Sequence, residues 1–288
     1  TDCNGRYCYL DPFVGAQIAV AEAARNLVCS GARPLGVTDC LNFANPEKPE
    51  AFWQFKRAVE GLAEACEFFN TPVISGNVSF YNETPETAIY PTPVIGMLGL
   101  IEDCNRRCEQ GFRAEGDIVA LLSGGRLIGD VSSLGGSEYL KTVHDMVAGA
   151  PPALDMAAEK RLHDCVLQAI SEGLLNSAHD CAEGGLAVAL AESCISGNIG
   201  ASVEIMAGGP AAATLFGEAQ SRVIVSLSGD NVEQLRNLAI ENNIRYETLG
   251  IAGGSKLRVG LNGTCVIDSD LQTISKAWRE AIPSRMVG

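Results

Sequence analysis

AQIAVAEAARNLVCSGARPLGV, residues 16–37, decides the fold class of this chain. Its apolar residues recur at helical spacing until a Ser-Gly pair, where a helix is expected to stop, and a proline then precedes a short strand. A second amphipathic helix is predicted over 48–70, followed by the apolar strand TPVISGNVSF, 71–80. Helices that alternate with strands rich in Val and Ile predict a sheet layered with helices, a mixed α/β architecture.

The same alternation runs on along the chain, interrupted by one polar stretch. The sequence predicts further strands over 92–103, 117–124, 201–206 and 221–229, helices over 159–175 and 231–243, a strand-to-helix turn over 177–196, a hairpin over 256–268 with Asn262-Gly263 at its turn, and a closing helix. The polar stretch CNRRCEQGFRAEGD, 104–117, carries a cluster of charges. We therefore predict two domains, 1–108 and 109–288, divided within it.

The composition is that of a globular protein with an acidic surface. Its 288 residues are 47% hydrophobic and 19% charged, which is enough to bury a core without disulfides. A formal net charge of −14 disfavours long-range attraction to nucleic acid or to anionic membranes. No apolar run approaches the roughly 20 residues that cross a bilayer, and the first residues do not resemble a signal peptide. We expect a cytoplasmic protein that binds neither nucleic acid nor membrane.

Eleven cysteines occur without a CxxC pair. Several lie inside apolar or helical patterns, among them Cys66, Cys165 and Cys194, where a thiol acts as a small hydrophobic group. We predict reduced thiols rather than a disulfide framework. Cys104 and Cys108, four residues apart, leave metal binding as an alternative, although no His is near them.

Small polar residues follow the second predicted strand, where an ordinary surface turn carries charges. SGNVSFYNET, 75–84, offers a flexible backbone at Gly76, amide oxygens at Asn77 and Asn82, a hydroxyl at Ser79 and a carboxylate at Glu83. Oxygen donors of this kind suit Mg²⁺. The stretch therefore predicts a site for magnesium or phosphate, with a turn held by Asx hydrogen bonds as the alternative.

A second polar stretch lies at the end of the preceding predicted strand. In GVTDCLNFANPEKP, 36–49, Asp39 follows a short apolar run. Ligands of layered sheets collect at the carboxyl ends of strands, so we expect the side chains of Asp39 and Asn77 to converge on one site. The alternative is that Asp39 only caps a helix or closes a turn.

A strand-to-helix turn offers a third candidate. In AHDCAEGGLAVALAE, 178–192, His179 and Asp180 precede Gly184 and Gly185, after which an apolar helix begins. Glycines at a helix N-terminus expose N–H groups that suit a phosphate. Asp180 can instead cap the helix, and His179 is either a general base or, more commonly for a single His, structural.

The fourth candidate precedes a buried strand. LFGEAQSRVIVSLS, 215–228, places Glu218, Gln220 and Arg222 at the mouth of that strand. Glu218 and Arg222 can equally form an i,i+4 pair on the surface, which is the simpler interpretation. The sequence contains no P-loop, no GxGxxG, no zinc signature and no Ser-His-Asp order.

These stretches, in this order and spacing, resemble a known family. The matching segments are GRYCYLDPFVGAQIAVAEAARNLVCSGARPLGVTDCLNFANPEKPE, PVISGNVSFYNET with AIYPTPVIGMLGLIED, AHDCAEGGLAVALAES and GEAQSRVIVS. They are similar to the second half of the synthetase subunit of the formylglycinamide ribonucleotide amidotransferases. That family belongs to a superfamily with aminoimidazole ribonucleotide synthetase, selenophosphate synthetase, thiamine monophosphate kinase and a hydrogenase maturation protein.

The resemblance implies an ATP- and Mg²⁺-dependent ligase of purine biosynthesis. Its family converts formylglycinamide ribonucleotide to the amidine with ammonia from glutamine, by phosphorylating the amide oxygen and letting ammonia displace the phosphate. Carried over position by position, Asp39 and Gly76 contact ATP, Asn77 binds Mg²⁺ and Ser79 contacts the ribonucleotide. Ala44 replaces a glycine of the family motif, and Cys3 stands where glycine is common.

The resemblance also implies that the active site is shared with another segment. Each copy of the family's tandem unit has an α+β first domain, whose sheets pair into a central barrel, and a layered α/β second domain. The catalytic base His, an ATP-contacting Lys and further magnesium ligands lie in the first copy, so no catalytic residue is assigned here. Glu218 and Gln220 correspond to a second, pseudo-symmetric site, and Ala219, where Ser is usual, argues against nucleotide binding there.

Three functional hypotheses follow. The chain begins without Met, so we expect the C-terminal half of the ligase, inactive alone, whose partners are the N-terminal half, a glutaminase subunit and a small adaptor subunit. The alternatives are a complete ATP-using enzyme of the superfamily, resembling selenophosphate synthetase or thiamine monophosphate kinase, and a non-catalytic scaffold half. Unpaired barrel strands also predict that the isolated chain forms a homodimer.

Overall fold

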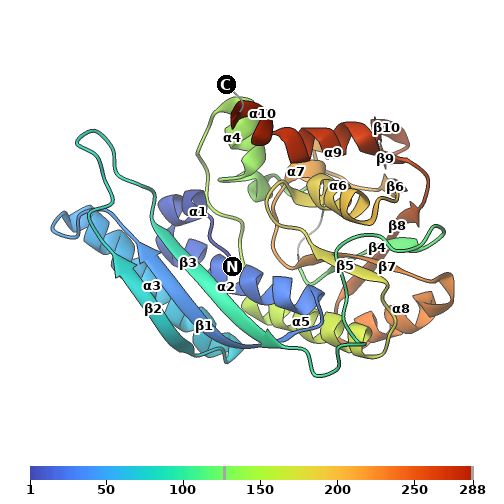
Figure 1. Ribbon diagram of the computed structural model, residues 1–288, viewed down its shortest axis with the longest axis horizontal. Helices are drawn as coiled ribbons and strands as arrows, with labels where there is room; N and C mark the ends of the chain where they lie inside the picture. The colour runs from blue at the N-terminus through green and yellow to red at the C-terminus, as the bar shows by residue number, and fades with distance from the viewer. Residues whose placement is uncertain (126–127, 287–288) are drawn as a thin grey trace.

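The computed structural model describes residues 1–125 and 128–286 and divides them between two sheets with helices packed on them (Figure 1). The helices are α1 (Gly5–Leu10), α2 (Pro12–Cys29), α3 (Pro49–Phe69), α4 (Glu138–His144), α5 (Met156–Ser171), α6 (Gly185–Gly197), α7 (Ala211–Phe216), α8 (Val232–Glu241), α9 (Leu271–Glu280) and α10 (Pro283–Met286), with 3-10 turns η1 (Val131–Leu134) and η2 (Gly229–Asn231). The strands are β1 (Arg33–Asn42), β2 (Val73–Ser79), β3 (Thr92–Leu100), β4 (Ile118–Ser123), β5 (Ser177–Asp180), β6 (Ala201–Ile205), β7 (Arg222–Leu227), β8 (Arg245–Ala252), β9 (Lys256–Leu261) and β10 (Thr264–Asp270).

The first domain is a three-stranded sheet with helices on one face. The strand order is β2-β1-β3, with β2 parallel and β3 antiparallel to β1. Val37, Leu41 and Ile95 are buried in a core that they share with α2 and α3. Asp11 caps α2 by accepting hydrogen bonds from the amides of the first turn, and Pro12 occupies its first position, so the sequence defines this helix start locally.

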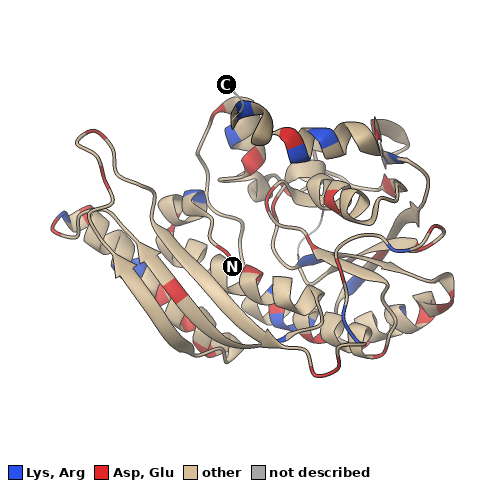
Figure 2. Cartoon of the chain, in the orientation of Figure 1, with Lys and Arg blue, Asp and Glu red and all other residues tan. Residues whose placement is uncertain are grey.

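No element among the described residues covers the opposite face of this sheet. Leu98 lies opposite Gly36 in the β1–β3 register, and a Cβ at Gly36 would lie 3.5 Å from the Ile74 side chain, so these positions share that face. Ile74 and Leu98 are 63% and 60% exposed. Figure 2 shows β3 free of charged residues. An apolar face of this kind is a candidate interaction surface.

The second domain is a seven-stranded sheet in the order β10-β9-β6-β8-β4-β7-β5. Its neighbouring strands are antiparallel except β6 and β9, which are parallel. One face packs on α5 and α8, and the other on α6 and α9. Side chains of β4 and β7 are buried on both faces, which explains why both strands read as continuous apolar runs.

The predicted two-domain mixed fold is confirmed. The predicted helices and strands lie within a few residues of the observed ones, and Asn262 and Gly263 form the β9–β10 turn with positive φ. Sequence patterns missed five helices and strands: α1, α4, α7, α10 and β8. The domain division at residue 108 stays a prediction, since β3 ends at Leu100 and β4 begins at Ile118. Among the described residues no helix combines the length and the apolar character that crossing a bilayer requires.

Candidate functional site

Asp39 and Gly76 occupy paired positions on β1 and β2. The carboxylate of Asp39 lies over Gly76 so closely that a Cβ there would be 2.6 Å from Asp39 Cγ. Partial burial raises the pKa of Asp39, and a hydrogen bond from the Asn77 backbone N–H offsets only part of this rise. A side chain at position 76 would therefore displace the Asp39 carboxylate.

Asp39 and Asn77 do not converge as expected. The register pairs Asp39 with Gly76 and Cys40 with Asn77, and successive side chains of a strand point to opposite faces. Asp39 is on the helix-covered face, where its charge contributes to raising the pKa of Cys66 on α3 to about 11, mainly an effect of burial. Asn77 is therefore on the bare face. The prediction that the side chains of Asp39 and Asn77 converge on one site was wrong, because the two side chains point to opposite faces of the sheet.

Ser79 shares the bare face with Asn77, since its partner Asn42 is two residues from Cys40. β2 is an edge strand of the sheet, so both faces of the sheet can be reached around it. Asp39 and Gly76 thus lie on one side of that edge, and Asn77 and Ser79 on the other. A ligand that contacts all four residues has to pass over the β2 edge.

The remaining polar residues of the 75–84 stretch hold the loop itself. Asn82 donates to the carbonyls of Phe43 and Ser79 at 3.0 and 2.9 Å, and Glu83 accepts from the Asn45 N–H at 3.1 Å. Lys48 pairs with Glu83 at 2.8 Å. Asn82 and Glu83 thus already bond to other groups of the protein, as expected for a turn held by side-chain hydrogen bonds. Gly76 and Asn77 remain candidates for binding a ligand.

The described residues do not contain a complete set of magnesium ligands. No group of three or more His, Cys, Asp or Glu side chains within the described part of the chain is arranged to hold a metal. On the bare face this chain offers the Asn77 amide and the Ser79 hydroxyl, both neutral, and the Ser79 hydroxyl is also hydrogen-bonded to the Asn82 side chain at 3.2 Å. Mg²⁺ binds through carboxylates as well as neutral oxygens. The donor set fits a magnesium ion whose carboxylates come from another segment.

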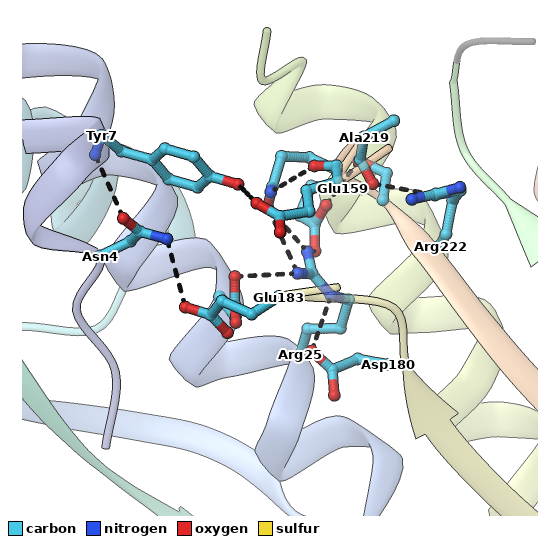
Figure 3. Close-up of polar contacts among 12 residues, drawn as sticks. Asn4, Tyr7, Arg25, Glu159, Asp180, Glu183, Ala219 and Arg222 are labelled. Carbon is cyan, nitrogen blue, oxygen red and sulfur yellow. Dashed lines mark hydrogen bonds and ion pairs between the residues drawn. The ribbon is translucent and has the colours of Figure 1, made fainter. Parts of the chain in front are cut away.

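Arg25 of α2 organises the second group of candidates (Figure 3). It is fully buried and lies 2.7 Å from Glu159, 3.6 Å from Asp180 and 3.5 Å from Glu22. It also donates to the Gln220 amide oxygen at 3.3 Å. Burial alone would raise the pKa of Glu159, but the charge of Arg25 and the hydrogen bond with His163 bring it down to about 2. Sequence patterns had not indicated Arg25, although an arginine inside an Ala-rich apolar helix signals a buried ion pair.

Glu218 is fully buried and joins three segments. It accepts hydrogen bonds from the Tyr7 hydroxyl, from the Gly184 N–H at 2.8 Å and from the Glu138 N–H at 2.8 Å. Burial raises the pKa of Glu218 to about 7, against the lowering effect of these bonds. The surface pair with Arg222 was wrong, because Arg222 is also buried and donates to the carbonyls of Ala219 and Gly217.

The strand-to-helix turn at 180–185 is occupied by protein groups. The Gly184 N–H bonds Glu218, and the Gly185 N–H bonds the Ala182 carbonyl at 2.9 Å. A Cβ at Gly185 would be 2.5 Å from the Gly217 carbonyl oxygen, so this glycine serves a close backbone approach. These contacts give the two glycines structural roles, and the phosphate role assigned to them stays untested.

Asp180 does not cap α6, whose N-cap is Gly184. Its neighbour His179 instead lies 2.9 Å from Glu192 and 3.5 Å from the Asp180 carboxylate. Both residues line a cavity of about 460 Å³, together with Asp2, Glu22, Asn26, Glu138, Ala182, Glu183, Gly184, Val188, Ala189, Glu192 and Trp278. Burial and the charge of Glu183 raise the pKa of Asp2 to about 7. An excess of carboxylates makes this cavity a poor receptor for a bare phosphate.

Both domains match known family descriptions. Residues 1–101 match the AIR synthase related protein N-terminal domain, and residues 114–262 match the AIR synthase related protein C-terminal domain. The chain belongs to the AIR synthase related family. The candidate residues Asp39 to Ser79 fall in the N-terminal match, and Asp180 to Gln220 fall in the C-terminal one.

Curated relatives of this AIR synthase related chain are longer than it is. Phosphoribosylformylglycinamidine synthase subunit PurL of Moorella thermoacetica is 52% identical over 285 residues, which are 99% of this chain and 38% of the relative. The same subunit of Anaeromyxobacter dehalogenans is 48% identical over 291 residues, 98% of this chain and 37% of the relative. The chain is thus a homologue of PurL that spans about 38% of its relatives' length.

Solved structures of the family share the fold. Thermotoga maritima PurL complexed with FGAR aligns with a TM-score of 0.78 at 18% identity, covering 95% of this chain and 45% of that chain. Escherichia coli HypE, a hydrogenase maturation protein, aligns with a TM-score of 0.69 at 15% identity, covering 91% and 83%. At these identities the likeness establishes the arrangement of both domains and nothing about ligands.

Proposed function

We propose that this chain is the C-terminal half of the synthetase that converts formylglycinamide ribonucleotide, ammonia and ATP to formylglycinamidine ribonucleotide, ADP and phosphate. The observation that carries the proposal is the match to PurL: about half of the residues are identical over 99% of this chain, but only 38% of the relative is covered. Thermotoga maritima PurL has been solved with ATP and with FGAR, which supports this choice of ligands.

Four residues of the first domain carry the proposed contacts. Asp39 and the Gly76 backbone hold ATP on the helix side of the β2 edge, and the Asn77 amide oxygen binds Mg²⁺ on the bare side. Ser79, two residues further on the same side, contacts the ribonucleotide. Mg²⁺ would neutralise the charge that develops on the transferred phosphoryl group. The groups of this chain bind and orient, and the base that handles protons comes from the other half.

The bare sheet face is the proposed seat of that other half. Ile74 and Leu98 expose apolar surface there, and the same face carries Asn77 and Ser79. A sheet from the other half that packs on this face would bury the apolar surface and bring its carboxylates to the neutral donors of this chain. We further propose a glutaminase subunit and a small adaptor subunit as partners, in the cytoplasm. A PurLQS structure is known for Thermotoga maritima.

Reconstitution tests this function. The chain is mixed with the part of Moorella thermoacetica PurL that lies outside the match, and ADP formation is measured with FGAR, ammonium and Mg-ATP. We expect no turnover from either piece alone, turnover from the mixture, and loss of turnover with Asn77→Ala. Turnover by this chain alone would identify a complete superfamily enzyme instead. A mixture that forms a stable complex without turnover would favour the hypothesis of a non-catalytic scaffold half, in which the bare face binds the partner but no ligand.

A further inference from the structure

The chain turns back on itself just after β2. Tyr81 has a positive φ of 61°, which is rare for a bulky side chain, and its N–H donates to the Ala44 carbonyl at 3.3 Å. This reversal brings Asn82 back to Ser79, the last residue of β2. Ser79 and Asn82 are both partly buried. A strained backbone of this kind persists where the contacts around it require it.

The side-chain amide of Asn82 has one possible orientation. Its Nδ2 lies 3.0 Å from the Phe43 carbonyl oxygen and 2.9 Å from the Ser79 carbonyl oxygen. Because a carbonyl oxygen can only accept, the two hydrogens of the Asn82 amide point to these two carbonyls. The amide therefore joins the residue that follows β1 to the last residue of β2.

That orientation fixes the hydroxyl of Ser79. The Ser79 Oγ lies 3.2 Å from Asn82 Oδ1 and 3.1 Å from Asn82 Nδ2. Oδ1 carries no hydrogen, so the Ser79 hydroxyl donates its one hydrogen to Oδ1. The hydrogens on Nδ2 are already directed to the two carbonyls. Ser79 is left with a lone pair on its oxygen for a ligand, so it can only accept a hydrogen bond from that ligand.

We propose that Asn82 is a positioning residue that fixes the Ser79 hydroxyl as an acceptor for a neutral N–H or O–H donor of the ribonucleotide. This inference rests on the proposed function, in which Ser79 contacts the ribonucleotide. A phosphate dianion has only acceptor oxygens, so it cannot bond to an oxygen that only accepts. The amide N–H groups and the ribose hydroxyls of formylglycinamide ribonucleotide are donors, and the contact is assigned to one of them.

Asn82 thus has two roles that can be separated. Its bonds to two main-chain carbonyls hold the loop, and its bond with Ser79 sets the direction in which that hydroxyl points. Loss of the first role lowers stability. Loss of the second lets the hydroxyl rotate and weakens ribonucleotide binding, while the proposed contacts of Asp39, Gly76 and Asn77 with ATP and Mg²⁺ lie earlier on the strands and should persist.

Kinetics of the reconstituted synthetase separate the two roles. The chain is combined with the rest of Moorella thermoacetica PurL, and KM is measured for FGAR and for Mg-ATP. We expect Ser79→Ala to raise KM for FGAR about five- to tenfold and Asn82→Ala about three- to fivefold, while kcat and KM for Mg-ATP change by less than about twofold. The double variant should match Ser79→Ala within about twofold, because Asn82 acts through Ser79. Thr84→Ala, which removes the hydroxyl that accepts from the Glu86 and Thr87 N–H groups in the same loop, is the matched control and should leave both KM values unchanged.

Analogues of the ribonucleotide identify the donor. Removal of the phosphate from FGAR should leave the ratio of KM values between Ser79→Ala and the parent chain unchanged. If that ratio falls to unity with a 2′-deoxy or 3′-deoxy analogue, the donor is that ribose hydroxyl, and if it persists with both, the donor is an amide N–H. A ratio that falls to unity when the phosphate is removed would overturn the proposal, as would effects of the two substitutions that multiply in the double variant.

A measurement on the chain alone tests the Asn82 contact without turnover. In ¹⁵N-labelled protein, the NMR signal of the Asn82 side-chain amide is identified by its loss in Asn82→Ala. Its hydrogens should exchange with water at least about tenfold more slowly than those of the exposed Asn198, and the signal should shift in Ser79→Ala. Fast exchange without a shift would refute the contact. A reconstituted mixture without turnover would instead refute the proposed function, and the exchange rates would still decide whether Asn82 holds the Ser79 hydroxyl.

Discussion

The carboxylate of Asp39 lies against the α-carbon of Gly76, its partner across β1 and β2, in the space that a β-carbon would fill. The two residues therefore constrain each other, and neither can be substituted without regard to the second. This relationship also places the proposed ATP contact at the edge of the sheet, within reach of a second polypeptide segment.

Gly76→Ala should destabilise the chain by about 1 kcal/mol, because the added methyl group displaces the Asp39 carboxylate. The measurement is urea unfolding followed by circular dichroism. Asp39→Ala should relieve the clash, so that the double variant is more stable than the sum of the two single effects implies, by about 1 kcal/mol. Gly229→Ala is the control, since nothing lies within 4 Å of a Cβ there. Additive effects would contradict the proposed contact.

Asn82→Ala should cost about 1 kcal/mol of unfolding free energy, because the Phe43 and Ser79 carbonyls each lose a side-chain donor and keep only a backbone one. Asn77→Ala, two residues before the end of β2 on an exposed position, should change stability by less than about 0.5 kcal/mol. Thermal unfolding of both variants separates the residue that holds the loop from the residue assigned to Mg²⁺. A large loss of stability in Asn77→Ala would mean that its effect on turnover is not specific.

Glu218→Gln should alter how stability depends on pH. The folded pKa of about 7 is above the unfolded value of 4.5, so the stability contributed by Glu218 is complete below pH 4.5 and is lost as pH rises through 7. Relative to the Gln variant, the parent chain should lose about 2 kcal/mol between pH 5.5 and 8. Urea unfolding at four pH values gives this difference. A difference that does not vary with pH would show that the carboxyl titrates outside this range.

Arg25→Met should destabilise the chain by about 3–5 kcal/mol at pH 7, because Glu159 and Asp180 lose their buried cation. Glu159 has a folded pKa of about 2, below its unfolded value of 4.5, so its contribution is present above pH 4.5 and is lost as pH falls toward 2. The free energy of unfolding of the variant should therefore decrease less than that of the parent chain as the pH falls from 4.5 toward 2. Arg33→Met removes an exposed ion pair with Glu102 and should cost less than about 1 kcal/mol.

Leu98→Glu should abolish self-association of the isolated chain. Leu98 is 60% exposed on the bare sheet face, and a carboxylate there would oppose burial against a second copy. Light scattering should report a dimer for the parent chain and a monomer for the variant. Phe52→Glu, on α3 and therefore on the opposite side of the sheet, should remain dimeric. A monomeric parent chain would refute the homodimer.

Local sequence patterns predict most of the fold. They do not predict how segments that are distant in the sequence pair with one another. The helices α2, α3 and α5 carry their apolar periodicity and caps in the sequence. The sequence did not predict helix α1, because six residues are too few to show a helical period of apolar positions. Whether Asp39 and Asn77 point to the same face depends on strand register, which one strand does not encode, and the observed register pairs Asp39 with Gly76.

The i,i+4 surface pair offered for Glu218 and Arg222 was wrong for a related reason. An i,i+4 pair requires a helix, but Glu218 lies between α7 and β7 in an irregular segment. Its true partner, Tyr7, is 211 residues away in the chain. Buried polar residues such as Arg25 and Glu218 find partners through the packing of the two domains, and no spacing rule within either domain specifies them.

The guanidinium of Arg25 comes from the first domain, and the carboxylates of Glu159 and Asp180 come from the second. Separating the two domains would take Glu159 and Asp180 away from Arg25, and would leave Arg25 with only Glu22 of its own helix as an ion-pair partner. Neither piece should fold well by itself, so the AIR synthase related modules of this protein form one cooperative unit and are not interchangeable parts.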